Sequence, residues 1–174
     1  AKTGKEYRAL LTYEYKNFPE DRGLATLRGD EITLDKTTTK AEDYDSYFDI
    51  WAWNDLSQQS TTVSFGWRRY YHAIYIANYI IENKDKITEA TADEINQLVG
   101  EAYMMRAYCH FLLVNLFAEP YTHCNAATPR GVPLSLKADV NAVLSCSSVE
   151  QVYQQVVDDV AKAKKHLTVE QWEE

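Results

Sequence analysis

The chain has 174 residues, of which 45% are hydrophobic and 25% are charged, so it is long enough and apolar enough to bury a sizeable core. Its formal net charge of -8 argues against nucleic acid as a partner, because phosphate-binding surfaces need clustered Lys and Arg, and the basic residues here are scattered. The longest uncharged run of the most apolar segment, Ala107 to Ala118, is too short to cross a bilayer and predicts a buried helix instead.

The first predicted helix covers Lys5 to Lys16, where apolar residues recur at helical spacing. The pair Phe18-Pro19 ends it, because the residue before a proline is pushed out of the helical conformation. The next region, Arg22 to Trp53, is predicted to be the least regular part of the chain. Within it, "EITLD" (31–35) fits a short extended piece, and "DYDSYFDIWAWND" (43–55) places aromatic residues among carboxylates.

Two long helices follow. The second predicted helix runs from about Thr62 to Asn83, because one stripe carries residues at helical spacing, namely Trp67, Tyr71, Ile74, Asn78 and Ile81. The third, 91 to 118, begins at a capping box formed by Thr91 and Glu94 and ends before Pro120. It is predicted to be the most buried helix.

A loop rich in Pro and Ala, Tyr121 to Cys146, precedes the last predicted helix, 148 to 167. A second capping box, Ser147 and Glu150, marks the start of this helix, and basic residues near its end complement the helix C-terminus. The helices are expected to pack antiparallel in pairs. The predicted fold class is therefore all-α, with tetratricopeptide-like helix pairs and long irregular loops.

Two features of the third helix predict how it packs. Gly100 and Ala107 lie one heptad apart, where missing bulk lets a neighbouring helix approach closely. Arg106 carries a charge in a mainly apolar helix, so it is expected to have a carboxylate partner, Asp158 or Asp159 of the last helix. The alternative is an exposed Arg106 on a narrow polar stripe.

The sequence offers no pattern for a metal, a cofactor or a catalytic group. The three cysteines are an odd number at unpatterned spacings, which defines neither a disulfide framework nor a zinc site. Cys109-His110 and His123-Cys124 cannot converge on one ion, because neighbours on a helix point about 100 degrees apart. No spacing suggests an activated nucleophile with its base, so we expect no enzyme.

Several segments together resemble the SusD/RagB family, the surface glycan-binding lipoproteins of Bacteroidetes-type bacteria. "GEAYMMRAYCHFLLVNLFAEPY" (100–121) resembles the signature helix of that family, and the stripe beginning at Trp67 is similar to the helix before it. Gly131-Val-Pro-Leu134 and the last helix, Tyr153 to Leu167, match in the same order. Two departures occur: Ala118 replaces the usual Gly, and "AEPY" is one residue shorter than usual before the proline.

The resemblance implies functions that the residue patterns alone do not. It implies a glycan ligand, no cofactor, and a partnership with a SusC-like TonB-dependent transporter of the outer membrane. It also implies that residues 1–174 are the N-terminal helical domain of a longer protein, held at the cell surface by a lipidated cysteine upstream. The alternative function is a helical-repeat scaffold that binds another protein through its concave face without binding sugar.

The segment "IWAWND" (50–55) is the candidate glycan contact. If it is extended, Trp51 and Trp53 lie on one face roughly 6.6 Å apart, close to the size of a sugar ring, and form a stacking platform. Asn54 and Asp55 could then bond sugar hydroxyls, and the earlier residues Arg28 and Asp30 could reach the same side. The alternative is that both indoles cover the helical core, since Trp is usually well buried.

Overall fold

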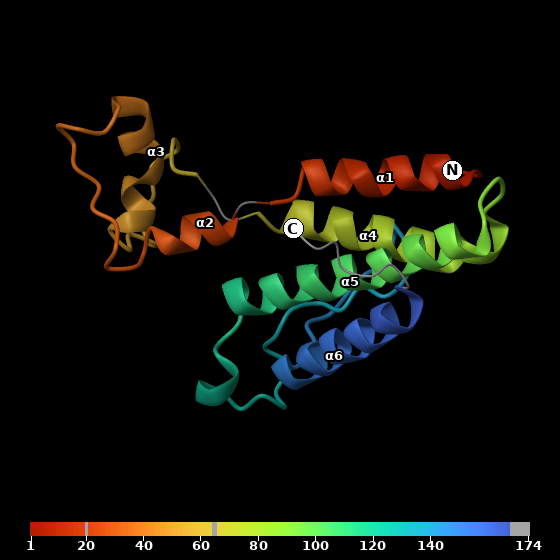
Figure 1. The fold of residues 1–174 in the computed structure, drawn as a ribbon. Helices are drawn as coiled ribbons and strands as arrows, with labels where there is room; N and C mark the ends of the chain where they lie inside the picture. Colours follow the sequence, from red (N-terminus) through yellow and green to blue (C-terminus); the bar gives the residue numbers. More distant parts are fainter. Residues whose placement is uncertain (20, 64–65, 168–174) are drawn as a thin grey trace. The chain divides into compact units, whose positions relative to one another are not determined.

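The computed structural model describes residues 1–19, 21–63 and 66–167, and within these ranges the chain is helical, with two isolated bridges and no strand (Figure 1). The predicted all-α class is thereby confirmed. The chain divides into two compact units. Ala1–Phe18 and Trp67–Glu174 form one, which we call the bundle unit, and Pro19–Gly66 forms the other, which we call the inserted unit.

The bundle unit consists of α1 (Gly4–Lys16), α4 (Trp67–Asn83), α5 (Ala92–Phe117) and α6 (Val149–His166). Each of these helices runs antiparallel to the one before it, as predicted (Figure 1). A short 3-10 helix, η1 (Lys84–Lys86), follows α4, and another, η2 (Tyr121–His123), begins the loop before α6. The predicted start of the second helix at Thr62 is wrong, because residues 62 and 63 are not helical; residues 64 and 65 lie outside the described residues.

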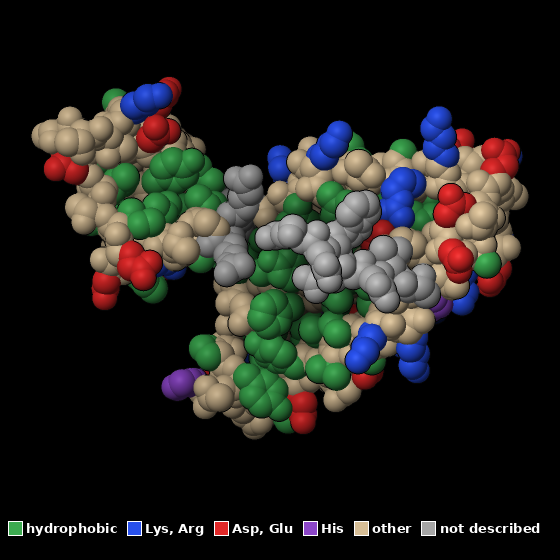
Figure 2. Space-filling view, viewed as in Figure 1, with side chains coloured by type: hydrophobic (Ala, Val, Ile, Leu, Met, Phe, Trp, Pro, Cys, Tyr) green, Lys and Arg blue, Asp and Glu red, His purple; other side chains and the backbone are tan. Residues whose placement is uncertain are grey.

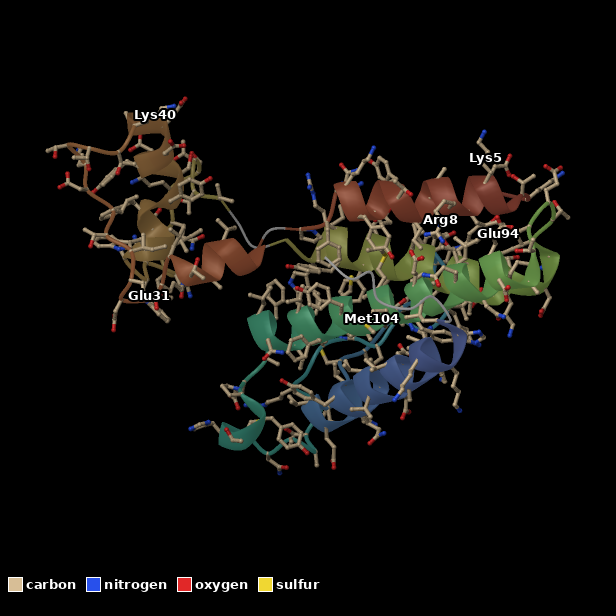
Figure 3. The ribbon with its side chains drawn as sticks, in the orientation of Figure 1. Lys5, Arg8, Glu31, Lys40, Glu94 and Met104 are labelled. Carbon is tan, nitrogen blue, oxygen red and sulfur yellow. The ribbon has the colours of Figure 1, made fainter. Side chains whose placement is uncertain are left out.

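Helix α5 contributes more buried residues than any other described helix, which explains its apolar composition. It packs between α4 on one side and α6 on the other, and α1 also contacts it. Arg8 of α1 (labelled in Figure 3) donates to Glu101 of α5 at 2.7 Å, and the Tyr15 hydroxyl donates to the same carboxylate at 2.8 Å. The core is therefore centred on α5.

The predicted capping boxes are correct for α5 and displaced by one residue for α6. Thr91 accepts from the backbone N–H of Glu94, whose carboxylate accepts from the backbone of Thr91. At α6 the N-cap is Ser148, which pairs with Gln151, and not Ser147 with Glu150. The two boxes read alike in the sequence, because glutamine closes a capping box as well as glutamate does.

The carboxylate partner predicted for Arg106 is present. Arg106 Nε and Nη2 donate to the two carboxylate oxygens of Asp159 at 2.7 and 2.6 Å, and Nη1 donates to Asn78 Oδ1 at 2.7 Å. Both Arg106 and Asp159 are buried, so the exposed alternative is excluded. Asn78 in turn donates to the carbonyls of Ser135 and Lys137, which ties the loop after η2 to α4. One polar cluster thus links α4, α5, α6 and this loop.

Glycines allow close approach at two positions. A Cβ on Gly100 would lie 2.8 Å from the side chain of Leu167 at the end of α6, as expected from the missing bulk on this face. A Cβ on Gly131 would lie 2.8 Å from the carbonyl of Ser147, whose oxygen accepts from the Gly131 N–H at 2.8 Å. The loop therefore packs directly against the start of α6.

The inserted unit contains α2 (Asp21–Thr26) and α3 (Ala41–Trp51). Helix α3 was not expected in the region predicted to be the least regular, so that prediction needs correction, and "EITLD" forms neither a helix nor a strand. Tyr44, Phe48 and Trp51 lie at helical spacing on α3, and their rings follow one another at 5.0 and 5.9 Å. This aromatic row explains why a segment rich in carboxylates is helical.

Three further expectations concern cysteines, metals and membranes. Cys109, Cys124 and Cys146 are free thiols. Across the described ranges, no group of three or more His, Cys, Asp and Glu side chains could hold a metal ion. None of the described helices is both long and apolar enough to cross a membrane.

Candidate functional site

The candidate site lies in the inserted unit, where α3 ends and a loop (residues 52–62, the Trp53 loop) follows. Trp51 is the last residue of α3. Its indole N–H donates to the carbonyl of Ile32 at 3.0 Å, and its ring packs against Phe48. Trp51 is thus half-buried and occupied by contacts within its own unit.

Trp53 differs from Trp51 in both backbone and exposure. Its φ is 55°, in the left-handed region that residues other than glycine rarely adopt, and its side chain is 63% exposed. The extended segment that would align the two indoles is therefore wrong: Trp51 is helical and Trp53 lies in a turn. Burial of Trp53 in a helical core is equally wrong, so of these two indoles only that of Trp53 is open.

Arg28 and Asp55 accompany Trp53, as predicted. The guanidinium carbon of Arg28 lies over the Trp53 ring, 4.7 Å from its centroid, and the same guanidinium pairs with the carboxylate of Asp55. A cation over an indole face is attracted by the ring's electron density, which holds the ring in place. Asp30 is exposed, and its side chain makes no hydrogen bond or ion pair with the described residues.

Asn54 is used inside the loop rather than presented to solvent. Its amide N–H donates to Asp49 Oδ1 at 3.0 Å, and its amide oxygen accepts from the Ser57 hydroxyl at 2.9 Å. The structure therefore gathers Arg28, Trp53 and Asp55 and gives Asn54 a supporting position.

Asp49 anchors the Trp53 loop and was missed from the sequence. It is buried near the end of α3, and its carboxylate accepts from the Thr62 hydroxyl at 2.6 Å and the Gln59 N–H at 2.7 Å, as well as from Asn54. These hydrogen bonds, that of Thr62 first, hold the pKa of Asp49 below its ordinary value. A signal was available: Asp49 sits beside the apolar Phe48 and Ile50, where a lone carboxylate needs partners.

This arrangement suits binding. An indole face that is open to solvent can stack on an apolar ligand face, and the guanidinium and carboxylate beside it can exchange hydrogen bonds with hydroxyl groups. The loop is held by a buried carboxylate, so Trp53 is presented in one orientation and less entropy is lost when a ligand binds.

A family model described as "Starch-binding associating with outer membrane", of the SusD-like type, matches residues 12–174. The SusD-like protein P38 of Formosa agariphila is 32% identical over 120 residues, which is 67% of this chain and 21% of that protein. The chain therefore spans about a fifth of the length of this relative.

Solved structures show a similar fold. A SusD superfamily protein of Bacteroides thetaiotaomicron superimposes with a TM-score of 0.70 at 24% identity, over 95% of this chain and 37% of that one. A SusD-like carbohydrate-binding protein of Bacteroides vulgatus gives 0.68 at 18% identity, over 100% of this chain and 38% of that one. At these identities the likeness shows the tetratricopeptide-like helical fold.

Proposed function

The chain belongs to the SusD-like family, and on this premise we propose that it binds glycan through the Trp53 loop and takes no part in catalysis. Trp53 is the observation that carries the proposal. Pyranose rings stack their C–H faces on aromatic rings, and the Trp53 ring is 63% exposed beside a guanidinium and a carboxylate.

The positions of the side chains in the inserted unit separate the residues that we assign to the glycan contact from those that support the loop. The Arg28 guanidinium lies over one face of the Trp53 ring and pairs with Asp55, so we assign the opposite face of the ring to sugar stacking and the Arg28–Asp55 pair to contacts with hydroxyl groups. Asp30, exposed on the segment that carries Arg28, is the further polar group we assign to this surface. Trp51 and Asn54 support the loop, since both are engaged by neighbours.

We further propose that the protein acts at the cell surface of the outer membrane. The family description, association with the outer membrane, supports this location. Attachment through a lipidated cysteine upstream of residue 1 and a SusC-like TonB-dependent transporter as partner extend the same proposal. In this arrangement the chain is the N-terminal helical domain of a longer protein, and glycan contacts from other parts of that protein add to those of the Trp53 loop.

A glycan-array screen of the full-length protein without its lipid site tests this proposal. We expect Trp53→Ala to abolish binding to every glycan that the wild type retains. The matched control is Trp67→Ala, because Trp67 is also an exposed indole, 41%, but belongs to α4 of the bundle unit. Binding that survives Trp53→Ala, or that both variants lose alike, would contradict the proposed site.

A protein-binding scaffold is the second candidate, and one observation favours it. Exposed apolar side chains follow one face of α5, and Figure 2 shows hydrophobic residues gathered there. Met104 (labelled in Figure 3) and Tyr108 of α5 line a groove of about 650 Å³ together with Tyr15 and Phe18. Exposed apolar stretches of this kind often mark protein contacts. If this candidate is right, Met104→Gln will abolish capture of a protein partner while glycan binding is absent from the start.

A further inference from the structure

A second hollow in the bundle unit lies where the last turn of α1 meets the first turn of α4. It has a volume of about 280 Å³ and is lined by Tyr13, Glu14, Asn17, Arg68, Arg69 and His72. All of these residues belong to the bundle unit, so the hollow is separate in sequence from the Trp53 loop. Three of its six side chains are basic or can become so.

The two arginines are placed where the helix does not favour them. Arg68 and Arg69 are adjacent, and both lie in the first turn of α4, which contains no acidic residue. The N-terminal end of a helix carries partial positive charge, so cations there are repelled by the helix. Local rules broken without a compensating gain in the fold are typical of functional positions.

The part of the chain that the structure describes provides no acidic partner for this pair. The chain has 26 acidic residues against 18 basic ones, yet neither Arg68 nor Arg69 forms an ion pair with any of the described residues. Both are exposed at the mouth of the hollow. Among the described residues, then, no carboxylate occupies their guanidinium groups.

The one carboxylate that lines the hollow, that of Glu14, contacts His72. Glu14 is buried, and its Oε1 lies 3.0 Å from His72 Nδ1. The charged and titratable side chains that face the hollow are thus Glu14, His72, Arg68, Arg69 and the phenol of Tyr13. One carboxylate faces two guanidinium groups in this lining, so the hollow has an excess of positive charge in an acidic protein.

We propose that this hollow binds an oxyanion: the carboxylate, sulfate or phosphate group of an acidic ligand. Guanidinium groups present parallel N–H donors that match two oxygens of such a group, and these charge-assisted hydrogen bonds are the strong ones. The Tyr13 hydroxyl is a further donor at the rim. The inference does not rest on glycan binding by the Trp53 loop, because it concerns other residues and another class of chemistry.

Titration of the protein with sodium sulfate, sodium glucuronate and neutral glucose, followed by NMR at constant ionic strength, tests the inference. We expect sulfate, glucuronate or both to shift the amide signals of Arg68, Arg69 and His72, and glucose to leave them unchanged. The sulfate and glucuronate arms tell which oxyanion is preferred. Constant ionic strength is needed because salt alone screens exposed charges.

Variants decide whether the arginines cause the shifts. Arg68→Gln/Arg69→Gln should lower the affinity of the protein for the oxyanion at least about tenfold, because charge-assisted hydrogen bonds are lost. Arg130→Gln/Lys137→Gln, which removes two exposed charges that do not line the hollow, should change the affinity less than about twofold, because exposed charges outside the site are screened by salt. The first variant should also melt no lower than the wild type, since it relieves the repulsion in α4. No shift with either anion, or equal weakening in both variants, would overturn the inference.

Discussion

Arginine and carboxylate meet in both units of this protein, with different consequences. In the bundle unit, the Arg106–Asp159 pair is buried, bidentate and completed by Asn78. In the inserted unit, the Arg28–Asp55 pair is partly exposed and lies against an open indole. A buried pair is costly to break because it leaves an unpaired charge inside the protein, whereas an exposed pair contributes little to stability. The same two groups therefore hold helices together in one unit and, in the proposed function, form part of the glycan contact in the other.

The largest effect is expected for Arg106. Arg106→Ala leaves Asp159 buried without its partner and should lower the free energy of unfolding by about 3 to 5 kcal/mol. Arg106→Met should cost less, because its methylene groups keep the packing of the arginine stem. Urea unfolding of the two variants and the wild type measures the difference. Equal stabilities for all three would show that the charge is merely solvated.

A pH effect of about 3 kcal/mol is expected from His110, which is buried on α5 one turn after Arg106. Burial, and then the charge of Arg106, lower the pKa of His110 from 6.5 to about 4. Because the unfolded chain takes up a proton first, the stability is complete above pH 6.5 and is lost as the pH falls towards 4. His110→Gln should flatten the pH dependence of unfolding in this range. An unchanged slope would contradict the role of His110.

A smaller, local effect is expected at Asp49. Asp49→Asn replaces an ionised acceptor of three hydrogen bonds by an amide, so the Trp53 loop should open more often. In the wild type, the lowered pKa of Asp49 means that the loop is held at all pH values above the ordinary 3.8 and is released only as the pH falls below it. Hydrogen exchange of the Gln59 amide reports this opening, and the Arg106 cluster serves as an internal reference that should not change.

The smallest changes in stability are expected for Trp51 and Trp53, and they should differ between the two residues. Trp51→Ala removes a half-buried ring that packs on Phe48 and should lower the stability of the inserted unit by about 1 to 2 kcal/mol. Trp53→Ala removes an exposed ring and should change stability by less than about 0.5 kcal/mol. Thermal unfolding of the two variants, followed by circular dichroism, measures the contrast. A larger loss for Trp53 than for Trp51 would reverse their roles.

The sequence predicted the bundle unit well because its elements depend on local signals. Apolar periodicity marked α1, α4, α5 and α6, and the Thr91 capping box placed the start of α5 within one residue. A carboxylate partner was predicted for Arg106 because a charge buried on an apolar helix needs an opposite charge. Asp159 is that partner.

The inserted unit was predicted less well, because its order comes from contacts between segments. The helical periodicity of α3 was difficult to recognise in the sequence, because carboxylates alternate with aromatic residues there. Tyr44, Phe48 and Trp51 are nevertheless spaced as on a helix. The left-handed φ of Trp53 could not be foreseen, since tryptophan has no preference for it and the Asp49 network stabilises the turn. For segment 50–55 the sequence predicted the wrong geometry, so one of its two indoles is open instead of both.

One paired measurement tests the contrast between the two units most directly: glycan affinity and melting temperature, determined on the same samples of Trp53→Ala and Arg106→Met. We expect Trp53→Ala to lose binding at an unchanged melting temperature, because the ring is exposed and the proposed function assigns it to the ligand. Arg106→Met should melt lower while its folded fraction binds as the wild type does. A Trp53→Ala protein that melts much lower and still binds when folded would mark Trp53 as a structural residue and place the glycan site elsewhere.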